Sequence, residues 1–273
     1  MKIVILTENT VYRRGLLAEH GLSLYIEENG KKYLFDTGQS GVFLKNAKEL
    51  GVNLENLDGI ILSHGHYDHC GGLEEFVKQY EPPKIYVRRE AFEEKLHQGK
   101  PEAEAKDIGI PWKKELIEDK LVYTEDFQEI DENIYVLGNI SMENDFEAVA
   151  KGMLVRRNKL CVPDCMSDEQ MLVIRSKEGL HVFVGCAHVG IINALSYVEK
   201  TFLGEKIVSL LAGMHLSTAP KEQVERTIQE LEKREIPLLM PLHCTGPAVI
   251  GKLKQSFPNT CKMVYTGKTI IEA

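Results

Sequence analysis

Short apolar runs that are typical of β-strands alternate with amphipathic stretches along most of the chain. The first run covers residues 3–6, and we interpret it as a first strand. Two further runs, at 22–27 and 32–35, flank Asn29-Gly30, a pair that tolerates positive φ and favours a hairpin. Alternation of this kind favours a layered α/β architecture over an all-α or all-β one.

The same two patterns continue through the rest of the chain. Apolar positions recur at helical spacing in residues 42–50, and Gly51 supplies a C-terminal stop. The sequence contains neither a short repeat nor a linker, so we predict a single domain over residues 1–273. A further helix is expected at 221–234, and further strands at 59–62, 153–156, 171–175, 181–184, 207–211 and 237–241.

Residues 88–131 differ from the rest in composition, with dense mixed charge and the single tryptophan, Trp112. We interpret this segment as a charged insertion or lid. A solvated helical excursion without a chemical role is the alternative, because runs of charge usually face water. If the segment covers a site, Trp112 and Tyr123 can form an aromatic wall for a flat substrate.

The chain has 273 residues and a formal net charge of −8, from 33 Lys and Arg against 41 Asp and Glu. A chain of this length can bury a core without a structural metal, which leaves any metal site free for chemistry. The acidic balance gives no broad attraction to nucleic acid or to anionic lipid, so we expect neither as a partner. We expect a small-molecule substrate instead, and a protein that can form a homo-oligomer.

Two features of the sequence favour a cytoplasmic protein. The N-terminal apolar run is too short for a signal peptide or a membrane span. The six cysteines include no C-x-x-C pair and no dense disulfide spacing, which suits reduced thiols.

Six of the nine histidines directly follow strand-like runs, in Gly or Ser contexts. Loops at the carboxyl ends of strands are where α/β sheets place their ligands, because a rigid sheet aims several loops at one crevice. Imidazoles that converge at such an edge predict a metal centre. The histidines concerned are His64, His66, His69, His188, His215 and His243.

The densest cluster is His64-x-His66-x-Asp68-His69. Its nitrogen and oxygen donors suit Zn²⁺, and also Fe or Mn. In a loop, His64 and His66 can point one way while Asp68 and His69 reach a second ion, so the segment can serve one or two metals. Two adjacent metals generate a nucleophile at neutral pH by clamping a bridging hydroxide.

These residues resemble a known family. His64-Gly-His-Tyr-Asp-His matches the H-x-H-x-D-H signature of the metallo-β-lactamase fold superfamily. Asp36, in Phe35-Asp-Thr-Gly, is similar to the strand-end aspartate of that superfamily's first motif, which orients the histidine loop. The resemblance implies an α/β fold of four layers, an αββα sandwich, and metal-dependent chemistry.

Three later segments resemble motifs of one branch of the superfamily: Gly185-Cys-Ala-His, Ala212-Gly-Met-His and Leu242-His-Cys-Thr. Members of this branch are labelled 7,8-dihydropterin-6-methyl-4-(β-D-ribofuranosyl)-aminobenzene-5′-phosphate synthases, or simply metal-dependent hydrolases. The resemblance covers nearly the whole chain and is thinnest across residues 88–131.

The resemblance also implies roles for single residues. Asp36 accepts the second ring N–H of a metal-bound histidine rather than binding metal itself. The implied ligands are His64 and His66 for the first metal, Asp68 and His69 for the second, and His243 as the final superfamily histidine.

The segment Gly185-Cys-Ala-His departs from the common pattern, in which a separate histidine loop precedes a strand that ends in Gly-Asp or Gly-Cys. His97 and His181 are unpersuasive ligands, so we choose His188 as the remaining histidine ligand. Cys186 stands where the bridging acid or cysteine is expected. It can bind a metal as a thiolate, or it can be a small buried residue, and both alternatives stay open.

We assign catalytic roles to Asp68 and His215. His215 suits a substrate contact or a proton donor for the leaving group, although it can also simply hydrogen-bond loop backbone. Asp164, Asp168 and Glu169 precede a strand and can support the site, but we favour surface capping for them.

We therefore predict a metal-dependent enzyme, with zinc as the expected metal, that acts on a small phosphorylated or pterin-like substrate. A metal-bound hydroxide attacks, or the metals assist departure of a leaving group. The sequence has no P-loop and no dinucleotide fingerprint, so ATP and NAD are not implied. The alternatives are a nuclease or phosphodiesterase on the same fold, against which the missing basic stripe weighs, and an iron-dependent redox or electron-transfer protein.

Overall fold

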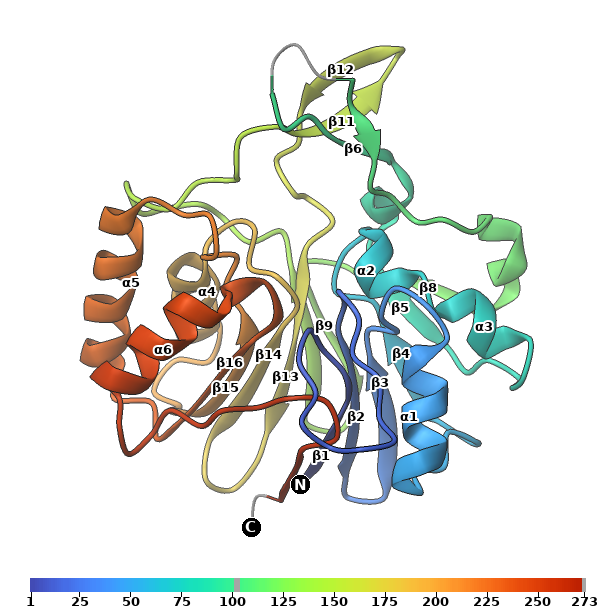
Figure 1. The fold of residues 1–273 in the computed structure, drawn as a ribbon, viewed down its shortest axis with the longest axis horizontal. Coiled ribbons are helices and arrows are strands. Elements are labelled where there is room, and N and C mark those ends of the chain that lie inside the picture. Colours follow the sequence, from blue (N-terminus) through green and yellow to red (C-terminus); the bar gives the residue numbers. More distant parts are fainter. Residues whose placement is uncertain (101–103, 272–273) are drawn as a thin grey trace.

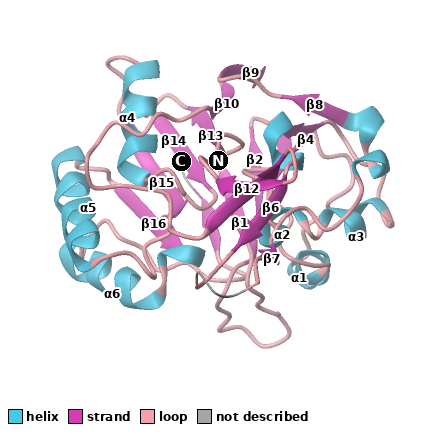
Figure 2. Cartoon of the chain, turned by 90° about the horizontal axis from the view of Figure 1, so that it is seen from above, coloured by secondary structure: helices cyan, strands magenta, loops and turns pink. Residues whose placement is uncertain are grey.

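The computed structural model describes residues 1–100 and 104–271, whose strands form three sheets. The two larger sheets pack face to face, and helices cover their outer faces (Figure 1, Figure 2). Helices α1 to α3 lie on one side of the pair and α4 to α6 on the other. This confirms the predicted four-layer αββα sandwich.

The first large sheet has the spatial order β17-β1-β2-β3-β4-β5-β8. Strands β3, β4, β5 and β8 run parallel to one another, while β1, β2 and β17 add antiparallel pairs. Its strands are β1 (Lys2–Thr7), β2 (Ser23–Glu28), β3 (Lys31–Phe35), β4 (Gly59–Ile61), β5 (Ile85–Val87), β8 (Leu121–Tyr123) and β17 (Thr269–Ile271).

The second large sheet has the order β16-β15-β14-β13-β10-β9, with β14, β15 and β16 parallel. Its strands are β9 (Phe127–Asp131), β10 (Ile134–Gly138), β13 (Gln170–Arg175), β14 (Leu180–Val184), β15 (Ile207–Gly213) and β16 (Leu238–Leu242). The third, smaller sheet stands at the top of Figure 1 with the order β12-β11-β6-β7. Its strands are β6 (Glu94–His97), β7 (Lys106–Asp107), β11 (Met153–Arg157) and β12 (Leu160–Pro163).

The helices are short and amphipathic. They are α1 (Val42–Leu50), α2 (Tyr67–Cys70), α3 (Leu73–Val77), α4 (Ile191–Thr201), α5 (Lys221–Arg234) and α6 (Pro247–Ser256). Single 3₁₀ turns occur at η1 (Arg89–Phe92), η2 (Lys114–Leu116), η3 (Glu118–Lys120) and η4 (His243–Thr245). In the described part of the chain, no helix is long and apolar enough to cross a membrane.

The core has a layer between the sheets and a layer under the helices on each side. Ile3 and Ile5 of β1 belong to the layer between the sheets, whereas Val4 and Leu6 pack toward α1. The side chains of β1 alternate in this way because successive strand residues point to opposite faces. Both faces of the strand are therefore buried, which explains its uninterrupted apolar run.

The predicted local elements are confirmed where the pattern was strongest. The hairpin forms between β2 and β3, with φ of 51° at Asn29 and 77° at Gly30. Helix α1 spans the predicted residues and ends at Gly51, whose φ of 68° is the left-handed conformation that glycine adopts without strain.

The described part of residues 88–131 contains strands and 3₁₀ turns, so the alternative of a helical excursion is wrong. Strand β8 pairs with β5 at the edge of the first sheet, and β9 pairs with β10 in the second. Trp112 is buried in the core, where its indole N–H donates to the carbonyl of Cys70 at 2.7 Å. The expectation that Trp112 forms an aromatic wall for substrate is therefore wrong.

A buried ion-pair cluster joins the small sheet to the rest of the molecule. The ammonium of Lys95 on β6 is fully buried, 2.8 Å from Asp164 Oδ2 and 2.6 Å from Asp168 Oδ1. Burial opposes the charge on Asp168, but the Lys95 ammonium outweighs it and lowers the pKa of Asp168. Because Asp164 and Asp168 are both buried, the surface-capping interpretation is wrong for them.

We predict that Lys95→Met lowers the free energy of unfolding by about 3–5 kcal/mol, because it leaves two buried carboxylates without a cation. Urea unfolding followed by circular dichroism measures this change. Arg156→Met is the control, since Arg156 makes an exposed pair with Glu94 on the same small sheet, where the cost is about 1 kcal/mol or less. Equal losses in the two variants would contradict a structural role for the buried cluster.

Candidate metal centre

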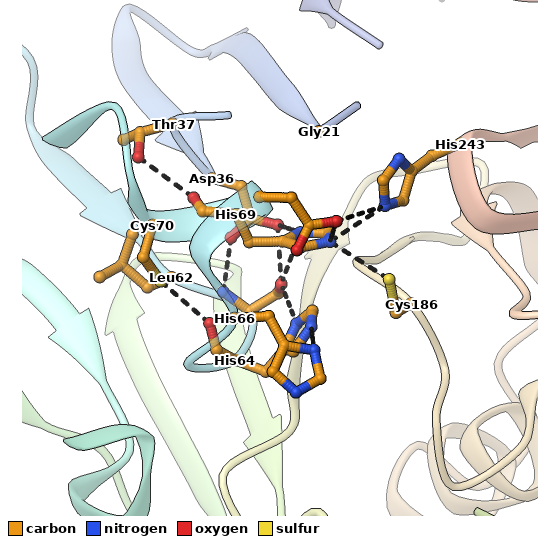
Figure 3. Close-up of polar contacts among 12 residues, drawn as sticks. Gly21, Asp36, Thr37, Leu62, His64, His66, His69, Cys70, Cys186 and His243 are labelled. Carbon is orange, nitrogen blue, oxygen red and sulfur yellow. Dashed lines mark hydrogen bonds and ion pairs between the residues drawn. The ribbon is translucent and has the colours of Figure 1, made fainter. Parts of the chain in front are cut away.

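The predicted ligands lie in loops at the carboxyl ends of strands. Asp36 follows β3 and His64 follows β4, and these strands are parallel neighbours. Cys186 follows β14 and His243 follows β16, with β15 between these strands in the second sheet. Facing sheets thus contribute their strand ends to one place, shown close up in Figure 3.

Asp36 lies at the base of this group of strand ends and is fully buried. Its Oδ1 accepts a hydrogen bond from the Ser63 backbone N–H, and its Oδ2 accepts one from the Ser63 hydroxyl, each at 2.7 Å. Nδ1 of His69 lies 2.6 Å from the same Oδ2 (Figure 3). The carboxylate thus holds the ring so that Nε2 faces the centre, as partners of metal-binding histidines do.

The packing around Asp36 leaves no room for a side chain at Gly185. A Cβ added there would lie 2.2 Å from the Ser63 hydroxyl oxygen and 3.4 Å from Asp36 Oδ2. The end of β14 therefore approaches the Asp36–Ser63 pair closely only because residue 185 is glycine.

His64, His66 and His188 form a first donor cluster, with ligand atoms within 4.8 Å of one another. Nε2 of His64 lies 3.0 Å from Nδ1 of His66. Both ring nitrogens of His188 are buried and have no hydrogen-bond partner among the described residues. Because a buried polar group without a partner is costly, these nitrogens indicate that a ligand or ion belongs beside them.

Asp68, His69 and His243 form a second cluster next to the first. Nε2 of His69 lies 3.2 Å from Nε2 of His243, and Asp68 Oδ2 lies 3.4 Å from the same His243 nitrogen. Sγ of Cys186 lies 3.2 Å from Nε2 of His69 (Figure 3), and it also groups with His64 within 4.8 Å. Cys186 thus stands between the two clusters, and the structure brings together every side chain predicted as a ligand.

Several residues at these strand ends adopt left-handed backbone conformations. The φ angles are 60° at Asp36, 50° at Ala187, 46° at His215 and 52° at His243. None of these residues is glycine, so each left-handed conformation lowers the stability of the fold by about 1–3 kcal/mol. Backbone strain of this kind clusters at functional sites, where the surrounding contacts enforce it.

Sequence reasoning missed two residues that hold ligand rings from behind. Oδ1 of Asn9 accepts a hydrogen bond from Nδ1 of His243 at 2.8 Å, and the Ser63 hydroxyl lies 2.9 Å from Nδ1 of His64. Asn9 follows β1 and Ser63 follows β4, so their places after apolar runs are the signal that could have identified them.

His20 was missed as well. Its Nε2 lies 3.2 Å from Asp68 Oδ2, and its half-exposed ring lies 5.1 Å from that of His243. No strand precedes His20 directly and no motif contains it, so the sequence holds no signal for this contact.

His215 lies beside the first cluster, with its ring centroid 4.3 Å from that of His188. Its backbone N–H donates to Sγ of Cys244 at 3.2 Å, while its ring Nδ1 has no hydrogen-bond partner within the described ranges. The backbone of His215 is therefore held in place, and its ring, which also contacts the side chain of Cys244, lies against the ring of His188.

Asp168 and Glu169 hold the loops that carry the ligands. Oδ2 of Asp168 accepts from the Gly65 N–H at 2.7 Å, and the Glu169 carboxylate accepts from the N–H groups of His188 and Val189 at 2.8 and 3.1 Å. Glu169 is buried, which corrects the surface-capping interpretation for this residue too, and burial raises its pKa to about 7.

The remaining histidines weighed as ligands lie elsewhere. His181 on β14 contacts the hydroxyls of Ser209 and Ser176, and His97 pairs with Met153 in the small sheet. Neither is a member of a donor cluster among residues 1–100 and 104–271.

Burial decides the protonation of the first cluster. It lowers the pKa of His66 to about 4 and holds the pKa values of His64 and His188 well below their usual range. Neutral imidazole is the form that binds metal. Burial opposes charge on His69 as well, but the carboxylates of Asp36 and Asp68 outweigh it and raise the pKa of His69 to about 9.

The donor set fits one or two transition-metal ions. It offers imidazoles, a carboxylate and a thiol, which suit Zn²⁺ and also Fe or Mn. Burial raises the pKa of the Cys186 thiol, so a thiolate there needs a cation beside it. The unpartnered nitrogens of His188 fit a role as metal ligands.

Comparisons with known proteins agree with this arrangement. The model of the metallo-beta-lactamase superfamily matches residues 17–145. The crystal structure of Tm1679, a metal-dependent hydrolase of the beta-lactamase superfamily, superposes with a TM-score of 0.88 at 31% identity, covering 100% of this chain and 99% of that one.

Two relatives come from Methanocaldococcus jannaschii. An uncharacterised protein is 33% identical over 260 residues, which is 93% of this chain and 94% of the relative. A 7,8-dihydropterin-6-methyl-4-(beta-D-ribofuranosyl)-aminobenzene-5′-phosphate synthase is 29% identical over 282 aligned residues, covering 99% of this chain and 96% of the synthase. From the fold, the donor clusters and these likenesses, the chain belongs to the metallo-β-lactamase superfamily.

Proposed function

We propose that this protein is a zinc-dependent enzyme of hydrolase type that acts on a small phosphorylated or pterin-like molecule. The observation that carries the proposal is the pair of adjacent donor clusters, which join the loop that Asp36 anchors to the ends of β14 and β16. The likeness to a metal-dependent hydrolase and to a dihydropterin-type synthase supports a small-molecule substrate.

In this proposal the two clusters hold two ions. When bound, such ions act as Lewis acids on the substrate and lower the pKa of a coordinated water. The proposed ligands are His64, His66 and His188 for the first ion, and Asp68, His69 and His243 for the second, with Cys186 between them.

The surrounding residues supply rigidity. Three ligand rings are held at Nδ1, so each presents Nε2 to the centre. The partners are Ser63 for His64, Asp36 for His69 and Asn9 for His243. Preset rings lose little entropy when an ion or a transition state binds, and their geometry needs no rearrangement during reaction.

The chain also supplies groups that can move a proton. We assign His215, whose ring lies beside His188 and lines the cavity next to it, as the proton donor to a departing group. Asp68 is the carboxylate of the second cluster, and we assign it a catalytic as well as a ligand role.

We expect purified, metal-replete protein to contain zinc and to turn over small substrates. The substrates are a dihydropterin diphosphate with a phosphorylated aminobenzene riboside, and bis-p-nitrophenyl phosphate, with RNA and single-stranded DNA alongside. Zinc-dependent turnover of a small substrate supports the proposal. Cleavage of the polymers alone would favour a nuclease, and stoichiometric iron with redox-active visible absorption would favour an electron-transfer protein.

We predict that His66→Ala loses most of its bound metal and at least about 100-fold in activity, because removing a ligand exceeds the 10–100-fold cost of removing a ligand's partner. Metal analysis, activity assay and circular dichroism measure this. His97→Ala is the matched control, since His97 lies on β6 outside the donor clusters. Unchanged metal content in the His66 variant would contradict the assignment of His66 as a metal ligand.

We predict that Cys186 binds metal as a thiolate. Protein loaded with Co²⁺ then shows thiolate-to-metal charge-transfer absorption in the near ultraviolet, and Cys186→Ala abolishes it. Cys70→Ala is the control and keeps the band, because Sγ of Cys70 donates to the His64 carbonyl at 3.0 Å rather than facing the clusters. Cys244 also groups with Cys186 and His243 within 4.8 Å, so Cys244→Ala is measured as well. A band that keeps its full intensity in Cys186→Ala and is lost in Cys244→Ala would show that Cys186 is only a small buried residue.

A further inference from the structure

A cavity of about 490 Å³ lies beside the first donor cluster. Three segments line it: residues 148–151 before β11, residues 187–190 after β14, and residues 214–223 between β15 and the first turns of α5. Its floor includes the buried residues Ala187, His188 and Met214, whereas Lys151 and Thr218 lie exposed at its mouth. The cavity thus opens to solvent at one end and meets a proposed metal ligand at the other.

The walls of this cavity are small and mostly apolar. Val149, Ala150 and Ala219 are among its lining residues, and none of them has a large side chain. Sites for small organic ligands commonly measure about 300–1,000 Å³ and are lined by apolar groups. The size and lining suit the body of an organic molecule better than water or a lone phosphate.

The cavity carries a formal positive charge at its mouth and, in the described part of its lining, no formal negative charge. Among the described residues that line it, Lys151 carries the only formal charge apart from the histidines, and there is no carboxylate. A cation at the mouth of an acidic protein favours an anionic ligand group at that place. The two ends of the cavity therefore suit different parts of a ligand: an anionic group at the mouth and the reacting group at the floor.

The loop that bears Lys151 is held in position. The next residue, Gly152, has a φ of 90°, and its carbonyl accepts from the Gln98 N–H at 2.9 Å, which ties the loop to the small sheet. The chain leading to this loop crosses the side of the molecule that carries α4 and α5 (Figure 1). There the Glu147 carboxylate accepts from the N–H groups of Ile192 and Asn193 at 2.9 and 2.8 Å.

We infer that this cavity binds the body of the substrate: a mainly apolar organic group whose anionic substituent lies at Lys151 while its reacting bond faces His188 and His215. The inference rests on the proposed function and adds the location and chemical class of the substrate. Ala150 determines specificity by leaving space for the apolar group, and Lys151 positions the substrate through its charge.

The test uses 2-naphthalenesulfonate, a flat ring with a stable anion, titrated calorimetrically into the protein with and without zinc. Methanesulfonate, which has the anion without the ring, is the comparison ligand. We expect Ala150→Phe to weaken naphthalenesulfonate binding at least about tenfold, because the new ring occupies the space of the ligand. We expect Lys151→Glu to weaken it about fivefold or more.

Lys252→Glu is the matched control, since Lys252 is exposed on α6 outside the cavity and the change alters the net charge equally. It should bind like the unmodified protein, and methanesulfonate should bind weakly to every variant. Equal binding of naphthalenesulfonate to the unmodified protein, Ala150→Phe and Lys151→Glu would overturn the inference, as would equal binding of the two sulfonates.

Zinc content and turnover of bis-p-nitrophenyl phosphate are measured on the same samples. If zinc is bound and the ester is hydrolysed but the cavity variants bind normally, the inference fails and the proposed function stands. If the cavity variants lose binding while zinc or turnover is absent from the unmodified protein, the proposed function fails and the cavity is a binding site without that chemistry.

Discussion

The buried carboxylate of Asp36 ties the strand ends to the histidine loop. It accepts hydrogen bonds from the N–H and hydroxyl of Ser63 and from the ring of His69. Ser63 in turn contacts Nδ1 of His64, so one carboxylate orients rings from both donor clusters. A buried carboxylate is stable only while such partners surround it, which makes the loop geometry and the anion mutually dependent.

The sandwich makes this arrangement possible because its two sheets end at the same edge. Parallel strands β3 and β4 deliver Asp36 and His64, and the facing β14 and β16 deliver Cys186 and His243. The left-handed backbone at Asp36 and His243 is a local cost that the buried contacts around them balance. The stability of the packed layers is thus partly used to hold a strained edge in a single geometry.

A second set of buried charges connects the histidine loop to the small sheet. Lys95 pairs with Asp168, and Asp168 also accepts from the Gly65 N–H inside the histidine loop. The small sheet, the loop and the 148–151 wall of the cavity are therefore parts of one connected structure. The same small sheet anchors the Lys151 loop through Gly152, so ring orientation and cavity shape depend on shared contacts.

The sequence by itself determined the local elements and the chemical type of the centre. The hairpin at Asn29-Gly30 and helix α1 up to Gly51 follow from residues that are neighbours in the chain, and the spacing of His64, His66, Asp68 and His69 identifies metal-type chemistry. Such patterns are readable because backbone preferences and side-chain periodicity act over a few residues.

Only the tertiary structure decided which distant residues meet. The contact of Asn9 with His243 joins residues 234 positions apart, and Cys186 reaches His69 across 117. The burial of Asp168, Glu169 and Trp112, and the approach of His20 to Asp68, are likewise results of packing. A single sequence cannot show these pairings, because they depend on how the two sheets stack and not on any local preference of the chain.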